Sequence, residues 1–569
     1  MKKNNKNTPF AALRQQIWSL FPLLLWSFSA QAATPAIPDA GQALRELDTR
    51  RPALAPSQPS GMDLPKPPAP APVEPGGGEQ PTVKVSAFTL AGNTLFSNAQ
   101  LQSLLHEYTG RDLTLAQLNQ AAQTITLYYQ QQGYVLNRAY LPEQEIENGV
   151  VKIAIVEAHY GEIKVDNTSR LADSTLKYLI SRNAAGTAIN ASKLQQTLLL
   201  LNDTPGVQAR SVLLTSQQPG AADLLVEAKP TPLFSGNLDL DNYGGRYTGK
   251  NRLSADISAN SPLGLGDRLR LRGLASDERQ HYYYLSYDAP VNRWFTRVGA
   301  AYSNMDYALG KDFADLDANG NARTASAYIS QPLYKSRTLS VSSQLQFDDK
   351  RLRDDINLFD SKSHKRSQLW TASLSANSQD TFGGGGLNFA AVSISHGHLD
   401  ITDPTTAQGD GMTAHTEGSF SKLNVSALRL QALSESWSFY TQLSGQLASK
   451  NLDSSEKFSL GGVNGVRAYA SGDASGDRGW MANLELRYAI TPAWQWKTFF
   501  DYGGVKTNKS PWTAEKNHQQ RGALGTGASW FGDNRQVSLQ LAWRVNHPSD
   551  DTSKLDRQPQ VWVQASQGF

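Results

Sequence analysis

The feature that most constrains the fold of this chain is an alternation of apolar and polar residues with a period of two, which begins after Pro230 and continues toward the C-terminus. A period of two places successive side chains on opposite faces of a β-strand. Apolar positions repeat in this way at 253–259, 269–271, 283–287, 339–347, 370–374, 439–443, 482–488 and 537–545. The C-terminal part of the chain is therefore predicted to consist of β-strands.

Two architectures share this alternation. A β-sandwich turns its polar side chains to water, whereas a transmembrane β-barrel turns apolar side chains to lipid and polar ones to its lumen. No domain break is evident in residues 230–569, and at about 20 residues per strand and turn this length holds roughly sixteen strands. Aromatic residues lie near the expected strand ends, at Trp294, Phe295, Trp437, Trp494 and Trp496. These observations favour a transmembrane β-barrel over residues 230–569.

The last strand supports the same choice. Val561, Val563, Ala565 and Phe569 share one face of this strand, and the chain ends on Phe569. A terminal amphipathic strand that ends in an aromatic residue resembles the signal by which bacterial outer-membrane barrels are recognised for insertion. The alternative is an ordinary amphipathic edge strand. Phe569 is therefore a candidate C-terminal insertion signal.

Residues 1–32 have the order of a secretory signal peptide. A basic region precedes a mostly apolar run at 17–28, and Ala30-Gln31-Ala32 has the form of a cleavage site. A membrane anchor is the alternative, but it needs about 20 apolar residues, and this run is too short. We expect an exported chain, and we expect none of its later segments to cross a membrane as a helix.

The composition excludes several classes of protein. The absence of cysteine excludes a disulfide scaffold, a thiolate metal site and a cysteine nucleophile. Negative mean hydropathy excludes a polytopic helical membrane protein. The formal net charge is only +3, and removal of residues 1–32 leaves the chain nearly neutral. No nucleic-acid partner is expected, because proteins that bind nucleic acid usually carry a strongly basic face.

Between the signal peptide and the barrel, the sequence indicates a linker and two small α/β modules. Residues 33–81 are rich in proline and cannot form a core. Within them, Asp39–Arg51 predicts a short helix that is polar on most sides, and so either frayed or docked in a polar cavity. Residues 82–158 form the first module and residues 159–229 the second, a weak repeat of the first.

Local patterns place the elements of the modules. In the first module a strand is expected at 83–88, a helix at 118–129 and a strand at 150–156. In the second, helices are expected at 172–180 and 191–201. Modules of this kind without catalytic signatures usually serve for recognition or as spacers.

Two motifs resemble chemical sites but are better interpreted as structural. Residues 244–251, GGRYTGKN, nearly match a phosphate-binding loop, yet Asn251 stands where Ser or Thr belongs and a strand follows. A hairpin loop is the better interpretation. His396 and His398 have no third ligand in view and are better interpreted as the end of a strand. The sequence predicts no catalytic site, metal or cofactor.

A glycine-rich stretch at 458–480 carries Arg467 between Val466 and Tyr469. In a second stretch Phe499 and Asp501 lie on the face of a strand opposite to Trp496, Phe500 and Tyr502. A carboxylate in a barrel wall needs a partner, and an arginine on a loop folded inward could form a bidentate pair with it. Two unrelated solvated charges are the alternative.

These residues together resemble the two-partner secretion transporters, the TpsB family of haemolysin and filamentous-haemagglutinin exporters, within the superfamily of outer-membrane barrels that carry POTRA domains. The resemblance implies a plug-like helix at 39–51, POTRA domains at 82–158 and 159–229, and a sixteen-stranded barrel at 230–569. The fold class is thus mainly β, with two small α/β domains and an N-terminal helix before the barrel.

The resemblance also assigns the two motifs. In the family a V-R-G-Y loop folds into the barrel, and its arginine pairs with the aspartate of an F-x-D-x-G strand. Val466, Arg467 and Tyr469 match the loop, and the matching wall residues are Phe499, Asp501 and Gly503. Ala468 replaces the family glycine, which would cost about 1 kcal/mol if this position needs a positive φ.

The function implied is export of one large secreted protein, captured unfolded by the POTRA domains in the periplasm and passed through the barrel to the cell surface. The resemblance further implies no enzymatic activity, contact with outer-membrane lipid and with the barrel-insertion machinery, and a monomeric state. A barrel-assembly or porin-like protein of the same superfamily is the alternative, and an outer-membrane hydrolase is a third. The sequence does not identify the cargo, whether haemolysin, adhesin or contact-dependent toxin.

Overall fold

A computed structural model describes residues 37–48, 62–63, 81–514, 516–546 and 558–569. The predicted signal peptide at 1–32, the end of the predicted helix at 49–51 and most of the linker at 33–81 lie outside the described residues.

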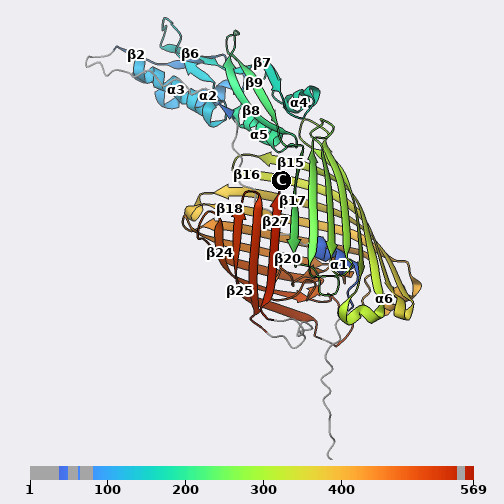
Figure 1. The fold of residues 1–569 in the computed structure, drawn as a ribbon. Coiled ribbons are helices and arrows are strands. Elements are labelled where there is room, and N and C mark those ends of the chain that lie inside the picture. Colours follow the sequence, from blue (N-terminus) through green and yellow to red (C-terminus); the bar gives the residue numbers. More distant parts are fainter. Residues whose placement is uncertain (1–36, 49–61, 64–80, 515, 547–557) are drawn as a thin grey trace, which may run out of the picture. The chain divides into compact units, whose positions relative to one another are not determined.

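Sixteen antiparallel strands form a closed barrel, in which β10 pairs with β27 and thereby joins the two ends of the sheet. Figure 1 shows many of these strands running side by side in the barrel wall. The strands are Phe234–Asp241 (β10), Arg252–Asn260 (β11), Arg268–Ser276 (β12), His281–Pro290 (β13), Arg297–Ala308 (β14), Ala318–Lys335 (β15), Leu339–Ile356 (β16), Ser361–Asp380 (β17), Gly386–Ile401 (β18), Gly418–Ala432 (β19), Trp437–Ala448 (β20), Arg478–Ala489 (β23), Trp494–Lys506 (β24), His518–Gly532 (β25), Arg535–Arg544 (β26) and Gln560–Gly568 (β27). The predicted fold class is confirmed.

The exposure of the strand residues distinguishes the barrel from a sandwich. On β11 the apolar Leu253 and Ile257 are 48% and 38% exposed, whereas the polar Ser254 and Asp256 are both only 9% exposed. Apolar side chains therefore face outward and polar ones inward, as in a transmembrane barrel. Phe295 is an exception among the aromatic residues near strand ends, because it is buried in the core of the second module.

The connections are short at the end of the barrel where the chain enters from the modules and longer at the opposite end. The longest of the latter spans residues 449–477 between β20 and β23. Short helices within the connections are Lys311–Leu316 (η2), Asn357–Phe359 (η3), Phe382–Gly384 (η4), Pro404–Met412 (α6) and Ser454–Glu456 (η5). None of the helices among the described residues is long and apolar enough to cross a membrane.

Helix α1, Ala40–Asp48, packs against the inner wall of the barrel. Asp39 caps it, since the Asp39 carboxylate accepts a hydrogen bond from the Gln42 backbone N–H at 2.8 Å. The prediction of a helix polar on most sides is incomplete. Ala40, Ala43, Leu44 and Leu47 form a buried apolar stripe at helical spacing, and it packs with Leu274, Tyr282, Met305 and Tyr307.

The first module contains a three-stranded sheet in the order β3-β6-β5 and a two-stranded sheet of β2 and β4. Helix α3 covers the larger sheet with the buried residues Leu118, Ala122 and Ile125. The bounds are Thr82–Lys84 (β2), Ala87–Ala91 (β3), Asn98–Ser103 (α2), His106–Tyr108 (η1), Asp112–Thr114 (β4), Leu115–Gln131 (α3), Arg138–Tyr140 (β5) and Val150–Val156 (β6).

The single strand predicted at 83–88 is two strands. β2 pairs with β4, whereas β3 pairs in parallel with β6. Between them the Ser86 backbone N–H donates to the Gly149 carbonyl at 2.8 Å, so that the chain changes partner here. The sequence pattern does not show this change, because Val83 and Val85 alternate with polar residues as in one strand that continues to Phe88.

The second module has a four-stranded sheet in the order β1-β8-β9-β7, with helices α4 and α5 packed on it. β1, which belongs to the Pro-rich segment, pairs in parallel with β8, and Met62 lies opposite Ser211. The bounds are Met62–Asp63 (β1), His159–Asn167 (β7), Asp173–Ile180 (α4), Ala191–Asn202 (α5), Val207–Thr215 (β8) and Ala221–Pro230 (β9).

Glu157, just after the last strand of the first module, holds the loop that follows β3. Its carboxylate accepts hydrogen bonds from the backbone N–H groups of Thr94 (2.9 Å) and Leu95 (3.0 Å), from the Thr94 hydroxyl and from the Tyr129 hydroxyl (2.6 Å). Burial by itself raises the pKa of Glu157, but these hydrogen bonds outweigh it and hold the pKa below its ordinary value.

Because this pKa is lowered by folding, the stabilisation by Glu157 is present at neutral pH and is lost as the pH falls below about 4.3. Glu157→Gln should reduce the hydrogen-exchange protection of Thr94 and Leu95 at pH 7 by about tenfold, since hydrogen bonds to a charged acceptor contribute about 1.5–3 kcal/mol. Glu145→Gln, at an exposed position of the same module, is the control. Equal protection in the two variants at pH 7 would show that the carboxylate does not hold the loop.

Candidate functional site

The connection at 449–477, called the lumenal loop below, turns back into the barrel. It begins with η5, and its short strands Phe458–Ser459 (β21) and Ser475–Gly476 (β22) pair with each other. Leu460, Val466 and Tyr469 of this loop are fully buried against the inner wall. Glycines permit the tight folding: a Cβ at Gly461 would lie 2.1 Å from the Ala470 carbonyl oxygen.

Arg467 at the centre of the lumenal loop binds Asp501 of β24. Its Nε and Nη2 atoms donate to the two oxygens of Asp501 at 2.8 and 2.7 Å, and its backbone N–H donates to the same carboxylate at 3.1 Å. Both side chains are completely buried. The structure thus brings together the arginine and the aspartate that the sequence motifs suggested, in the bidentate geometry expected for a strong pair.

A second carboxylate, which sequence reasoning missed, completes the site. Glu485 of β23 accepts from Arg467 Nη1 at 2.6 Å and from Arg487 Nη2 at 2.6 Å. Two guanidinium groups therefore face two carboxylates, so that the buried charges balance. Alternation along β23 places Glu485 on the face opposite to Leu484 and Leu486, which is the inner face of the barrel. This alternation could have identified Glu485 as a lumenal carboxylate from the sequence.

Glycines of the wall make room for the loop. The Arg467 guanidinium lies 3.4 Å from the centre of the Phe499 ring. A Cβ at Gly525 would lie 2.2 Å from that ring, and a Cβ at Gly503 would lie 2.8 Å from Leu460 of the loop. Phe499 and Gly503 therefore belong to the surface that receives the loop. The Phe499 ring packs against the Arg467 guanidinium, and the absence of a side chain at Gly503 leaves space for Leu460.

Further hydrogen bonds join the loop around Arg467 to the C-terminal part of the chain. The Tyr469 hydroxyl donates to the Asn546 carbonyl at 2.9 Å, and Trp562 Nε1 donates to the Arg467 carbonyl at 2.7 Å. Ala468 does not adopt a positive φ, so the cost considered for an alanine in place of glycine does not arise. Val466 has no polar role and packs in the same apolar cluster.

Phe569 lies away from this site. Its backbone exchanges two hydrogen bonds with Gly236 at the start of β10, at 3.0 and 3.1 Å, and its side chain is 59% exposed. Val561 and Val563 also face outward, whereas Trp562 between them is 1% exposed. The last residue therefore extends the seam between the first and last strands and presents its ring on the outer surface.

Lysines on strands β16, β17 and β19 hold the start of the lumenal loop. Lys350 of β16 and Lys422 of β19 donate to the two oxygens of Glu456 at 2.8 and 2.6 Å. Lys365 of β17 donates to Asp453 at 2.7 Å. Since Glu456 is 2% exposed, its charge depends on these ammonium groups for compensation. This group of five residues is called the lysine anchor below.

Helix α1 contacts the loop beside the lysine anchor. The Ser454 hydroxyl donates to Asp39 at 2.7 Å, and Arg45 donates to the Ser454 carbonyl. A Cβ at Gly41 would lie 2.3 Å from the Ser454 hydroxyl. The helix and the loop are therefore in direct contact, and a helix residue larger than glycine at position 41 would separate them.

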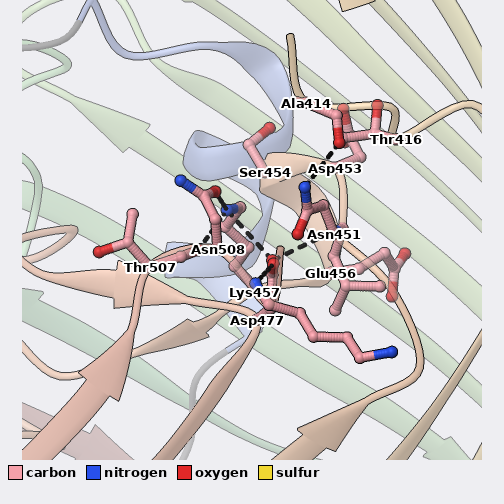
Figure 2. Close-up of polar contacts among 12 residues, drawn as sticks. Ala414, Thr416, Asn451, Asp453, Ser454, Glu456, Lys457, Asp477, Thr507 and Asn508 are labelled. Carbon is pink, nitrogen blue, oxygen red and sulfur yellow. Dashed lines mark hydrogen bonds and ion pairs between the residues drawn. The ribbon is translucent and has the colours of Figure 1, made fainter. Parts of the chain in front are cut away.

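Asp477, where the lumenal loop rejoins the barrel, connects several segments. Figure 2 shows Asp477 beside Lys457, Asn451 and the 507–508 segment. Its carboxylate binds Lys457 at 3.1 Å and accepts from the backbone N–H groups of Leu452 and Lys509 at 3.0 and 2.7 Å. Asn451 joins the 414 and 510 segments through its side-chain amide. These contacts close the loops over this end of the barrel.

The two motifs interpreted as structural lie elsewhere. Residues 244–251 lie in the connection between β10 and β11, which confirms the hairpin loop. His396 and His398 lie within β18, and their rings contact the hydroxyls of Ser421 and Ser419 at 2.9 and 3.0 Å.

A closed sixteen-stranded barrel, preceded by α/β modules and holding an inward-folded loop, defines a POTRA-bearing outer-membrane transporter. The family model described as haemolysin secretion/activation protein ShlB/FhaC/HecB matches residues 220–530, and the model of the ShlB-type POTRA domain matches residues 83–158. The chain belongs to this family, the TpsB transporters of two-partner secretion, and the resemblance inferred from the sequence is confirmed.

Curated relatives and a solved structure agree with this assignment. The heme/hemopexin transporter protein HuxB of Haemophilus influenzae Rd is 28% identical over 488 residues, which cover 83% of this chain and 84% of the relative. The outer membrane transporter CdiB of Dickeya dadantii is 24% identical over 414 residues, 71% of each chain. The structure of CdiB from Escherichia coli has the same fold, with a TM-score of 0.73, 19% identity and coverage of 90% of this chain and 94% of that one. The protein is an outer-membrane transporter with its POTRA region in the periplasm.

The lysine anchor makes one prediction about channel closure. Glu456→Gln removes the carboxylate that compensates Lys350 and Lys422, and breaking a buried ion pair costs about 3–5 kcal/mol. The start of the lumenal loop should then leave the wall more often, which should raise the fraction of time that the channel conducts in a planar lipid bilayer. Glu435→Gln, an exposed residue in a connection at the other end of the barrel, should conduct like the wild type. Unchanged conductance in Glu456→Gln would mean that the anchor does not keep the loop in place.

Proposed function

We propose that this transporter exports one large secreted partner protein, of the haemolysin, adhesin or toxin type, as an unfolded chain. The observation that carries the proposal is the lumenal loop itself, held inside the barrel by Arg467, Asp501 and Glu485. A loop fastened to the wall by polar contacts can exchange those contacts for water when the lumen opens. The proposal includes two POTRA domains, at 82–158 and 159–229, and no catalytic activity, cofactor or metal.

The partner is captured in the periplasm by strand addition, which reads backbone groups more than side chains. In the second module one outer edge of the sheet carries β1, and β7 forms the other. Apart from an isolated bridge between His159 and Ala188, β7 pairs only with β9 among the described residues. In the first module β3 and β5 form the two edges of the larger sheet. These strands are where an extended segment of the partner would pair.

Passage through the barrel requires both inner obstacles to move. Helix α1 and the lumenal loop contact each other through Asp39 and Ser454, so displacement of one removes a contact of the other. The inner wall also carries charged and polar side chains, such as Ser254 and Asp256 of β11, and an extended chain with its backbone hydrated can pass along them. Folding of the partner outside the cell supplies the driving force.

The names of the relatives indicate which kinds of partner protein to consider. HuxB is named a heme/hemopexin transporter, CdiB an outer membrane transporter and ShlB of Serratia marcescens a hemolysin transporter. We propose a partner that is secreted and large, and a transporter that is monomeric and depends on the barrel-insertion machinery and on outer-membrane lipid. Phe569 serves as the C-terminal insertion signal.

A deletion strain tests the class of function. Loss of the gene should remove one large protein from the culture medium and leave the other outer-membrane barrels at their normal abundance. The measurement is quantitative proteomics of the medium and of the outer membrane. Depletion of many barrels, with no secreted protein missing, would favour the alternative, a barrel-assembly protein.

Arg467→Ala tests the role of the lumenal loop. The substitution leaves Asp501 and Glu485 without the guanidinium between them, so the loop should lose its seat and export should fall by at least about tenfold, given a cost of about 3–5 kcal/mol for a broken buried pair. Insertion should be unchanged, as measured by heat-modifiable migration of the barrel. Arg535→Ala, which removes an exposed arginine from β26, is the matched control. Normal export by Arg467→Ala would refute the proposed role of the pair.

A further inference from the structure

Three basic residues form a row across adjacent strands of the barrel. Arg478 at the start of β23 lies directly opposite Lys506 at the end of β24, and Lys506 lies directly opposite His518 at the start of β25. Cationic side chains in direct cross-strand register repel one another and destabilise a sheet. This row is therefore unfavourable by itself and calls for a compensating anion.

The row faces outward, at the extracellular end of the barrel. Trp480, two residues after Arg478 on the same face, is 52% exposed, whereas Val505, beside Lys506 on the opposite face, is 3% exposed. The row is next to the lumenal loop, at the end of the barrel away from Phe569 and the modules. It thus lies on the lipid-facing surface at the level of the outer leaflet.

An apolar depression lies in the wall beside the row. Its volume is about 440 Å³. Glycines create it, since a Cβ at Gly504 would have its nearest neighbour at 3.6 Å and a Cβ at Gly445 at 3.4 Å. Trp480 and Tyr502 stand at its side with their ring centres 6.0 Å apart. The outward-facing apolar side chains that line the depression are Leu423, Val425, Leu447 and Trp480.

The row has no acidic partner in the part of the chain that the structure describes. The Arg478 guanidinium donates to the Ala448 carbonyl at 3.3 and 3.2 Å, which leaves its charge uncompensated. Asp477, the residue before Arg478, faces inward and binds Lys457. No described carboxylate lines the depression. The surface thus combines uncompensated positive charge with an adjacent apolar hollow.

We propose that this surface binds a phosphorylated lipid of the outer leaflet, with a phosphate on Arg478 and Lys506 and an acyl chain in the depression beside Trp480. Arginine and lysine together are well suited to phosphate, and an anion between them removes the repulsion within the row. The apolar hollow selects a lipid over a free phosphate ion. Because Arg478 follows Asp477, the lipid binds beside the residue that fastens the extracellular loops.

The test is lipid binding by the full-length protein in detergent, followed by native mass spectrometry. The probes are a bis-phosphorylated, multiply acylated glucosamine disaccharide lipid, the same lipid after phosphatase treatment, and inorganic phosphate as a competitor. The wild type should bind the phosphorylated lipid about tenfold more tightly than the dephosphorylated one, as expected for charge-assisted hydrogen bonds. Millimolar inorganic phosphate should not displace it.

Two sets of variants isolate the row. The double substitution Arg478→Ala with Lys506→Ala should weaken binding of the phosphorylated lipid about tenfold and leave the dephosphorylated lipid unaffected. The control is Arg351→Ala with Lys362→Ala, which removes two exposed basic residues at the same end of the barrel that pair with Asp349 and Asp360. Trp480→Ala should weaken both lipids equally. Heat-modifiable migration shows that each variant is folded, and Arg478→Lys with Lys506→Arg should retain binding.

Three outcomes would overturn the proposal. Wild-type affinity in the double variant would show that the row does not hold the phosphate. Equal affinity for the phosphorylated and dephosphorylated lipids would show that the depression binds acyl chains alone. Displacement of the phosphorylated lipid by millimolar inorganic phosphate would show an anion site with no preference for lipid.

Discussion

The structure depends on one buried arginine. Arg467 lies in the barrel interior with no exposed surface, and its charge is met by Asp501 and Glu485 from adjacent strands and by the face of Phe499. A charge removed from water is costly unless it is paired and hydrogen-bonded. The arginine can therefore lie inside only while the loop is seated on this wall. When the lumen fills with water, the same groups can be solvated separately, so the contact is strong and yet reversible.

The remaining inner contacts are arranged around this one. The lumenal loop is fastened to the β23–β24 wall through Arg467 and to the β16–β19 wall through Glu456 and its two lysines. Helix α1 contacts the same loop at Ser454, two residues before Glu456. The three contacts therefore lie within one continuous stretch of chain, residues 454–467.

Much of the fold could be predicted from the sequence, because each strand has a lipid-facing side that repeats with a period of two. The predictions that were wrong or incomplete concern which segments and side chains pack against each other. The segment at 82–91 divides into two strands because it changes neighbours at Ser86, and Phe295 turns into the core of the second module. The apolar stripe of α1 has the spacing of a helix face, but four residues among charged neighbours are difficult to recognise without the surface they meet.

The sequence by itself determined the loop and wall motifs, since Arg467 and Asp501 stand in short patterns whose spacing survives in any fold. Only the tertiary structure decided which other residues surround Arg467 and Asp501. Glu485 comes from β23, Gln540 from β26 and Trp562 from β27, and closure of the barrel in one register brings all three to Arg467. The physical reason is that register is a property of paired strands: a shift of one residue would turn Asp501 to the lipid, and no single strand contains that information.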